Sequence, residues 1–125
     1  ALGVGRGWAL TAVAAGLGNL AAAAVHYPGP YVSIGASTAI FAALGVLTGH
    51  ALPACFHAAR PWWNAAVPAG GGLAFLGLYG AGGRQTDVVA HAAGFAAGLL
   101  VGLAAAGFGS GTSRKDPARE LRPPA

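Results

Sequence analysis

The sequence predicts an all-α, polytopic bundle of membrane-spanning helices. Charged side chains make up only 8% of its 125 residues and hydrophobic residues make up 55%, whereas a soluble domain carries about 25% charged residues. Four apolar segments approach or reach the roughly 20 residues that a helix needs to cross a bilayer. None shows the two-residue alternation of barrel strands. Because backbone groups in lipid must be satisfied within their own segment, we expect four spanning helices.

The four expected helices, in chain order, cover residues 7–25, 35–52, 65–79 and 88–108. The first ends at the Tyr27–Pro30 cluster, whose two prolines cannot continue a helix. The second begins at Gly35 and ends at Pro53 or one turn beyond it. The first and fourth reach the spanning length, and we expect flanking residues to lengthen or tilt the other two.

The third expected helix contains the run Gly70–Gly72, which would allow either bending as part of a gate or close packing. The fourth follows Thr86-Asp87, residue types that commonly cap a helix start. Residues 109–125 are rich in Gly and Ser, then in charge, then in Pro. Such a composition is typical of disorder, so we expect one transmembrane domain over residues 1–108 and a disordered basic tail over 109–125.

The placement of Lys and Arg predicts the orientation. With four spans, six of the seven basic residues fall on one side and Arg84 stands alone on the other. Basic residues favour the cytoplasmic side. We therefore expect an integral, multi-pass protein of the plasma (inner) membrane, with its tail cytoplasmic and the connections at 27–33 and 81–87 facing outward. The chain contains no methionine, so we expect its natural start to lie upstream.

His91 is an ionisable group inside the fourth expected span. A charged side chain at the membrane centre costs about 2.5 kcal/mol or more, so such a residue normally faces the bundle interior. Gly94, Gly98 and Gly102 share its helix face and form a ridge that lets another helix approach closely. His91 is a candidate general base if the helix carrying Ser37 is that neighbour. The alternatives are a histidine satisfied by a backbone carbonyl, or one that lines a polar path.

Ser37 stands near the expected start of the second helix. The first N–H groups of a helix have no partner within it, and this end carries partial positive charge. Backbone N–H groups around Gly35 and Ser37 would therefore stabilise an oxyanion, while His91 takes the serine proton. The alternative is that Ser37 or Thr38 only caps the helix or packs.

Asp87 lies four residues before His91, so it could orient the imidazole. Its position favours a helix cap instead. The other histidines show no helical metal-ligand spacing, and we expect no metal site. We expect no cofactor, because the chemistry needs only water, and no nucleic-acid partner, because no basic stripe with interleaved aromatics is present. Oligomeric state is left open.

Two segments resemble the rhomboid family of intramembrane serine proteases. Gly35–Phe41, followed by Leu44-Gly45, resembles the family's Gly-Ala-Ser-Gly-Ala-Ile-Phe-Gly segment. Asp87–Gly98 resembles its Ala-His-x-x-Gly-x-x-x-Gly helix, and Ala15–Asn19 resembles the helix that precedes the serine motif. The resemblance covers roughly Gly3–Gly107, and the order and spacing of the motifs make the combination specific.

The resemblance implies that Ser37 is the nucleophile and His91 the general base, with Asp87 outside the catalytic machinery. It also implies a six-helix core, of which this chain would hold the last four helices. The family's oxyanion-binding His and Asn lie on an earlier helix and have no match here. Thr38 stands where the family usually has glycine. A branched side chain next to the nucleophile could crowd the substrate or the helix start, which puts the reaction rate in question.

The resemblance further implies single-pass transmembrane proteins as substrates, cleaved near the outer membrane face. The main alternative is a catalytically inactive rhomboid-like protein that binds transmembrane clients. A third interpretation is a transporter or channel subunit with His91 as a proton relay, which would call for further ionisable residues at the membrane midplane.

Overall fold

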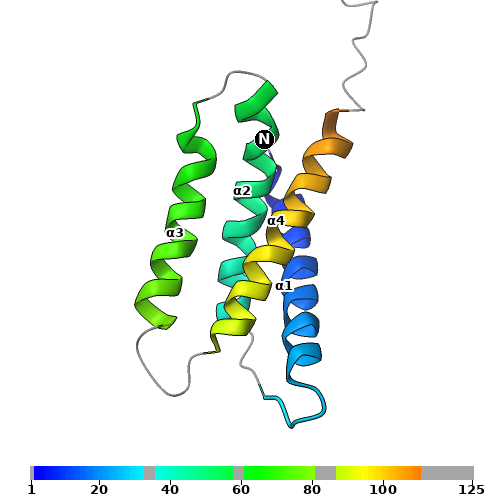
Figure 1. The fold of residues 1–125 in the computed structure, drawn as a ribbon. Helices are drawn as coiled ribbons and strands as arrows, with labels where there is room; N and C mark the ends of the chain where they lie inside the picture. The colour runs from blue at the N-terminus through cyan, green and yellow to red at the C-terminus, as the bar shows by residue number, and fades with distance from the viewer. Residues whose placement is uncertain (1, 33–35, 58–60, 81–86, 111–125) are drawn as a thin grey trace, which may run out of the picture.

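The computed structural model describes residues 2–32, 36–57, 61–80 and 87–110, which form helices and contain no strand. The helices are α1 (Val4–His26), α2 (Ala36–His57), α3 (Trp63–Gly80) and α4 (Val88–Ser110) (Figure 1). The predicted all-helical fold is confirmed. The disordered tail was expected to begin at residue 109, but Gly109 and Ser110 form the end of α4, because their composition does not stop the helix at Phe108. Residues 111–125 of the expected tail lie outside the described residues.

Pro53 lies inside α2 rather than at its end. Proline lacks an N–H and removes one hydrogen bond from a helix interior. The helix nevertheless continues for one further turn to His57, which is the longer of the two ends that the sequence allowed.

Three of the four helices are long and apolar enough to cross a membrane: α1, α2, and α4 over Val88–Gly109. The chain is therefore a multi-pass membrane protein. α3 is helical as predicted but has 18 residues and, over its described part, is not among these candidate spans. The fourth crossing stays a prediction.

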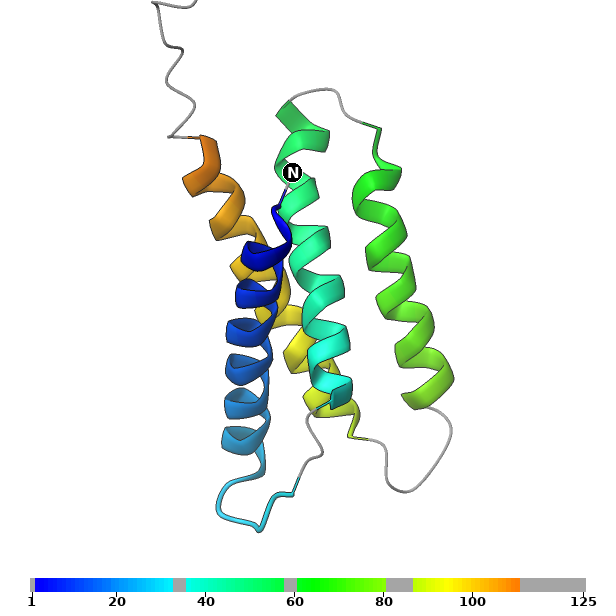
Figure 2. The same cartoon turned by 180° about the vertical axis from the view of Figure 1, so that it is seen from behind.

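The helices start and end at two common levels of the bundle. The ends of α1 and α3 lie beside the starts of α2 and α4, while the other four helix ends lie at the opposite side (Figures 1 and 2). α2 lies between α3 and α1 and packs along α4, whereas α3 touches α4 only slightly. α2 and α4 run in parallel, so their first turns share one level.

Most buried positions carry small residues, with Phe41 and Val46 as larger buried side chains, and many large apolar side chains face outward. The buried positions of α1 are Ala14, Gly18 and Ala22, while Leu20 and Leu100 are mostly exposed. In water such an apolar exterior would favour aggregation. In lipid it is the expected arrangement, because small residues at helix contacts allow close packing while lipid tails cover the large ones.

The glycine ridge of α4 lies against the backbone of α2. A Cβ atom added to any of its three glycines would lie far inside contact distance of an α2 carbonyl oxygen: 2.7 Å at Gly94, 2.2 Å at Gly98 and 2.3 Å at Gly102. Two α2 glycines meet α4 in the same way, since an added Cβ would lie 2.2 Å from an α4 carbonyl oxygen at Gly45 and at Gly49. The two backbones are therefore in direct contact.

Candidate functional site

Ser37 and His91 lie at the same end of the bundle. Ser37 is the second residue of α2 and His91 is the fourth residue of α4, and the starts of these two helices are neighbours (Figure 1). Ser37 is half-buried, and the His91 side chain is 5% exposed. The structure thus puts the two predicted groups at one level and within adjoining helices.

Phe41, on the same helix as Ser37, contacts His91 directly. Its ring stacks on the His91 imidazole, with centroids 4.5 Å apart and planes 24° from parallel. Phe41 follows Ser37 by four residues, so the two share one face of α2. The face that carries Ser37 is therefore turned toward His91. No role for Phe41 was predicted from the sequence, although an aromatic residue one turn after the candidate serine was a usable signal.

Thr38 packs against Gly94, the first glycine of the α4 ridge. Its side chain is fully buried, and its carbonyl oxygen and Cγ2 would lie 2.7 and 2.8 Å from a Cβ added at Gly94. Thr38 and Gly94 are thus complementary in shape at the α2–α4 crossing. The branched side chain is directed into this contact, where the sequence raised the question of crowding beside the nucleophile.

The Thr38 hydroxyl is buried and has no hydrogen-bond partner among the described residues. Leaving a buried hydroxyl unpaired costs about 1–3 kcal/mol. We therefore expect Thr38→Val, which keeps the shape and removes the hydroxyl, to leave the free energy of unfolding unchanged or raise it by up to about 1 kcal/mol. Unfolding in detergent micelles would measure this, with Thr48→Val as control, because the Thr48 hydroxyl donates to the Leu44 carbonyl at 2.8 Å. Destabilisation by Thr38→Val would show that the hydroxyl has a partner.

No hydrogen bond joins the Ser37 hydroxyl to the His91 imidazole within the described part of the chain, and the buried Nδ1 of His91 has no partner there. A general base must come within about 2.6–3.2 Å of the group it deprotonates, and such contacts are often longer before substrate binds. The catalytic roles of Ser37 and His91 stay predictions.

The start of α2 places beside Ser37 backbone N–H groups that have no acceptor within the helix. Because the helix begins at Ala36, the Ser37 N–H is one of the first four, which have no acceptor within the helix. Ser37 thus lies inside the helix rather than at the capping position. Gly35, the other residue expected to support an oxyanion, lies outside the described residues.

Asp87 caps α4, as the sequence favoured. Its Oδ1 accepts a hydrogen bond of 2.9 Å from the Ala90 N–H, which satisfies one of the orphan donors of the first turn. Its Oδ2 accepts a hydrogen bond from the Tyr31 hydroxyl. Both carboxylate oxygens thus accept hydrogen bonds from groups other than the His91 imidazole. The contact with Tyr31 was not anticipated from the sequence.

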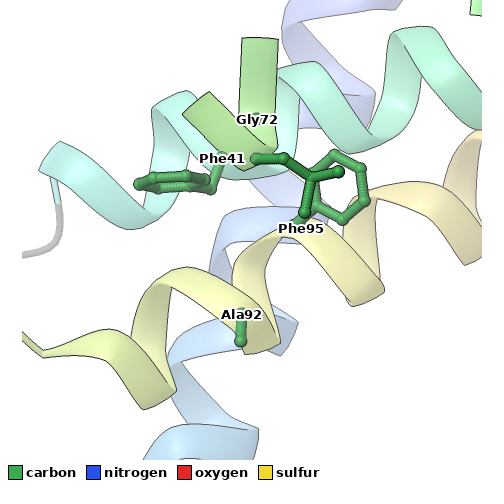
Figure 3. Close-up of a pocket in the computed structure, with 5 residues that line it drawn as sticks. Phe41, Gly72, Ala92 and Phe95 are labelled. Carbon is green, nitrogen blue, oxygen red and sulfur yellow. The ribbon is translucent and has the colours of Figure 1, made fainter. Parts of the chain in front are cut away.

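An apolar pocket of about 130 Å³ lies beside Phe41. It is lined by residues of α2, α3 and α4: Phe41, Gly72, Leu73, Ala92 and Phe95 (Figure 3). Its polar lining is slight, so it suits a hydrocarbon group. No group of three metal-ligating side chains occurs among the described residues.

Comparisons with known proteins identify the family. Searches of the curated proteins and of the solved structures gave no match. A family model described as the Rhomboid domain matches residues 1–108, which is most of the chain and includes all of the helices up to the last turn of α4. The chain therefore belongs to the rhomboid family, whose members are intramembrane serine proteases or inactive relatives of them.

Proposed function

We propose that this protein is an intramembrane serine endopeptidase that cleaves transmembrane substrate helices near the outer membrane face. Ser37 is the nucleophile and His91 the general base. The observation that supports this most is the stack of Phe41 on His91, because it turns the Ser37 face of α2 toward a buried imidazole. An ionisable residue held inside a membrane bundle is normally retained for function.

The reaction passes through an acyl-enzyme intermediate. The Ser37 oxygen attacks the carbonyl carbon of the scissile bond while His91 takes the hydroxyl proton. The N–H groups at the start of α2 stabilise the resulting oxyanion. The C–N bond then breaks as His91 returns the proton to the leaving amine, which leaves an acyl-enzyme. Water attacks this ester, with His91 taking and returning a proton, and the new carboxylic acid is released from Ser37.

The packing of the bundle supports this chemistry. Phe41 limits the orientations of the His91 ring, and the glycine contacts bring α2 and α4 together at backbone distance. Catalytic groups held in a fixed relation avoid an entropic cost during reaction. A substrate helix must partly unwind before attack, since its peptide bonds are shielded and hydrogen-bonded within the helix. We therefore expect small, helix-destabilising residues at the cleavage site.

The second candidate is a catalytically inactive family member that binds transmembrane clients. The unmade hydrogen bond between Ser37 and His91 favours it, because an active pair must meet at some stage of the reaction.

Labelling with a fluorophosphonate tests the proposal directly, because this probe reacts with activated serines. We expect peptide mapping of the full-length protein to place the label on Ser37, with none on the Ser37→Ala variant. His91→Ala should slow the labelling at least about 100-fold, the usual contribution of a general base. His57→Ala is the matched control, since His57 is exposed at the far end of α2. Unchanged labelling in His91→Ala would remove His91 as the base.

A further inference from the structure

A hydrogen bond outside the proposed catalytic pair ties two distant parts of the chain together. The hydroxyl of Tyr31, in the connection that follows α1, donates to Oδ2 of Asp87, at the start of α4. Tyr31 also stacks on His26, with ring centroids 4.7 Å apart. His26 in turn donates from Nδ1 to the Ala22 carbonyl at 2.8 Å. Tyr31 is therefore held from the α1 side before it reaches α4.

Asp87 relays this contact to the first turn of α4. Its Oδ1 accepts from the Ala90 N–H at 2.9 Å, and its backbone carbonyl accepts from the His91 N–H at 3.1 Å. One residue thus binds Tyr31 with one carboxylate oxygen, caps the helix with the other and begins the hydrogen-bonded turn that ends at His91. We call the Tyr31–Asp87 hydrogen bond the clasp.

The surroundings of Asp87 keep its carboxylate, the acceptor of the clasp, ionised. Partial burial acts to raise the pKa of its carboxyl. The hydrogen bonds from Tyr31 and Ala90, with the nearby imidazoles of His26 and His91, outweigh burial and hold the pKa below its usual value. A carboxyl whose pKa is lower in the folded protein than in the unfolded chain stabilises the fold. This contribution is complete when the pH is above the unfolded-state pKa, and it is lost as the pH falls through the folded-state pKa. The clasp is therefore intact at neutral pH.

We propose that Tyr31 and Asp87 are positioning residues for His91. The clasp holds the first turn of α4 against the end of α1, so that the imidazole keeps its place on Phe41 and faces α2. This inference rests on the proposed protease function. Displacing a reacting group by about 1 Å can cost 10²-fold in rate, so a contact that holds this turn acts on turnover more than on substrate binding.

Two substitutions break the clasp while keeping the aromatic ring at position 31 and the cap of α4. Tyr31→Phe removes only the hydroxyl. Asp87→Ser keeps a capping oxygen for the Ala90 N–H but is too short to reach Tyr31. Asp87→Asn is the rescue variant, because its amide can cap with the oxygen and donate to the Tyr31 oxygen. Tyr27→Phe is the matched control, since the Tyr27 side chain is 83% exposed.

The first experiment measures cleavage of a labelled transmembrane substrate by the full-length protein. We expect Tyr31→Phe and Asp87→Ser each to lower kcat about tenfold with KM little changed, and the double variant to be no worse than either. Asp87→Asn and Tyr27→Phe should stay close to wild type. Unchanged kcat in both clasp variants, additive losses, or a loss confined to KM would overturn the proposal.

The second experiment needs no catalytic activity. NMR of histidine-labelled protein in micelles reports the ring-current shift that Phe41 imposes on the His91 ring protons. We expect this shift to change in Tyr31→Phe and Asp87→Ser and to persist in Tyr27→Phe and Asp87→Asn. An unaltered shift in both clasp variants contradicts positioning. If Ser37→Ala still cleaves substrate, the protease proposal fails, while this measurement still decides whether the clasp positions His91.

Discussion

Replacing Ser37 with alanine is expected to abolish cleavage of a transmembrane substrate, with a loss of at least about 10⁴-fold. The hydroxyl oxygen forms the covalent intermediate, and the adjacent Thr38 side chain cannot replace it because it is fully buried against Gly94. His91→Ala should cause a loss of similar size. Because the two residues act as one unit, the double variant should be no less active than either single variant.

The measurement uses full-length protein in liposomes with a fluorescently labelled single-pass substrate. Thr11→Ala on α1 and His57→Ala at the end of α2 are matched controls for loss of a hydroxyl and of an imidazole. Both should retain wild-type cleavage. Circular dichroism would establish that every variant is folded. Cleavage that survives Ser37→Ala would remove the proposed nucleophile, and wild-type binding of clients without any cleavage would favour the inactive family member.

Replacing Gly98 with alanine is expected to lower the free energy of unfolding by about 3 kcal/mol, the upper end for overpacked sites. The added Cβ would lie 2.2 Å from the Ala42 carbonyl oxygen and 3.0 Å from the Val46 nitrogen. Both neighbours are backbone atoms, so no side chain can rotate away. The α2 and α4 backbones must move apart, and Ser37 would separate from His91 as they do.

Gly107→Ala is the matched control on the same helix, because a Cβ there has no neighbour within 4 Å. Alanine favours the helix by about 1 kcal/mol over glycine in exposed positions, so this variant should be neutral or slightly stabilised. Denaturant unfolding in micelles, followed by circular dichroism, compares the two. Equal stability of both variants would show that the α2–α4 contact can relax without cost.

The helices could be predicted because each one is specified locally. Apolar length marks a span, and the cap at Asp87 depends only on residues within one turn. The face of α4 that packs most closely was also readable, since Gly94 and Gly98 repeat at helical spacing. The identity of the helix covering that face was not, because periodicity describes one helix and not its neighbour.

The contacts around His91 could not be predicted for the same reason. Phe41 and Tyr31 belong to segments far from α4 in sequence, and only the folded chain brings them to His91 and Asp87. Thr38, which was expected to crowd the site, shows how far prediction from one segment can go. The sequence shows a branched residue beside the candidate nucleophile, but the direction of its side chain, toward Gly94, depends on how the helices cross.

The glycine ridge has a further consequence for the register of α2 and α4. Gly94 and Gly98 are four residues apart, so sliding α4 by four residues, about 6 Å, would set one glycine where another had been. The glycine ridge by itself would therefore allow α4 to pack on α2 in the shifted register. The clasp and the Phe41–His91 stack each occur once, and only one alignment satisfies them. Polar contacts that specify a single register are a known device where apolar packing is degenerate.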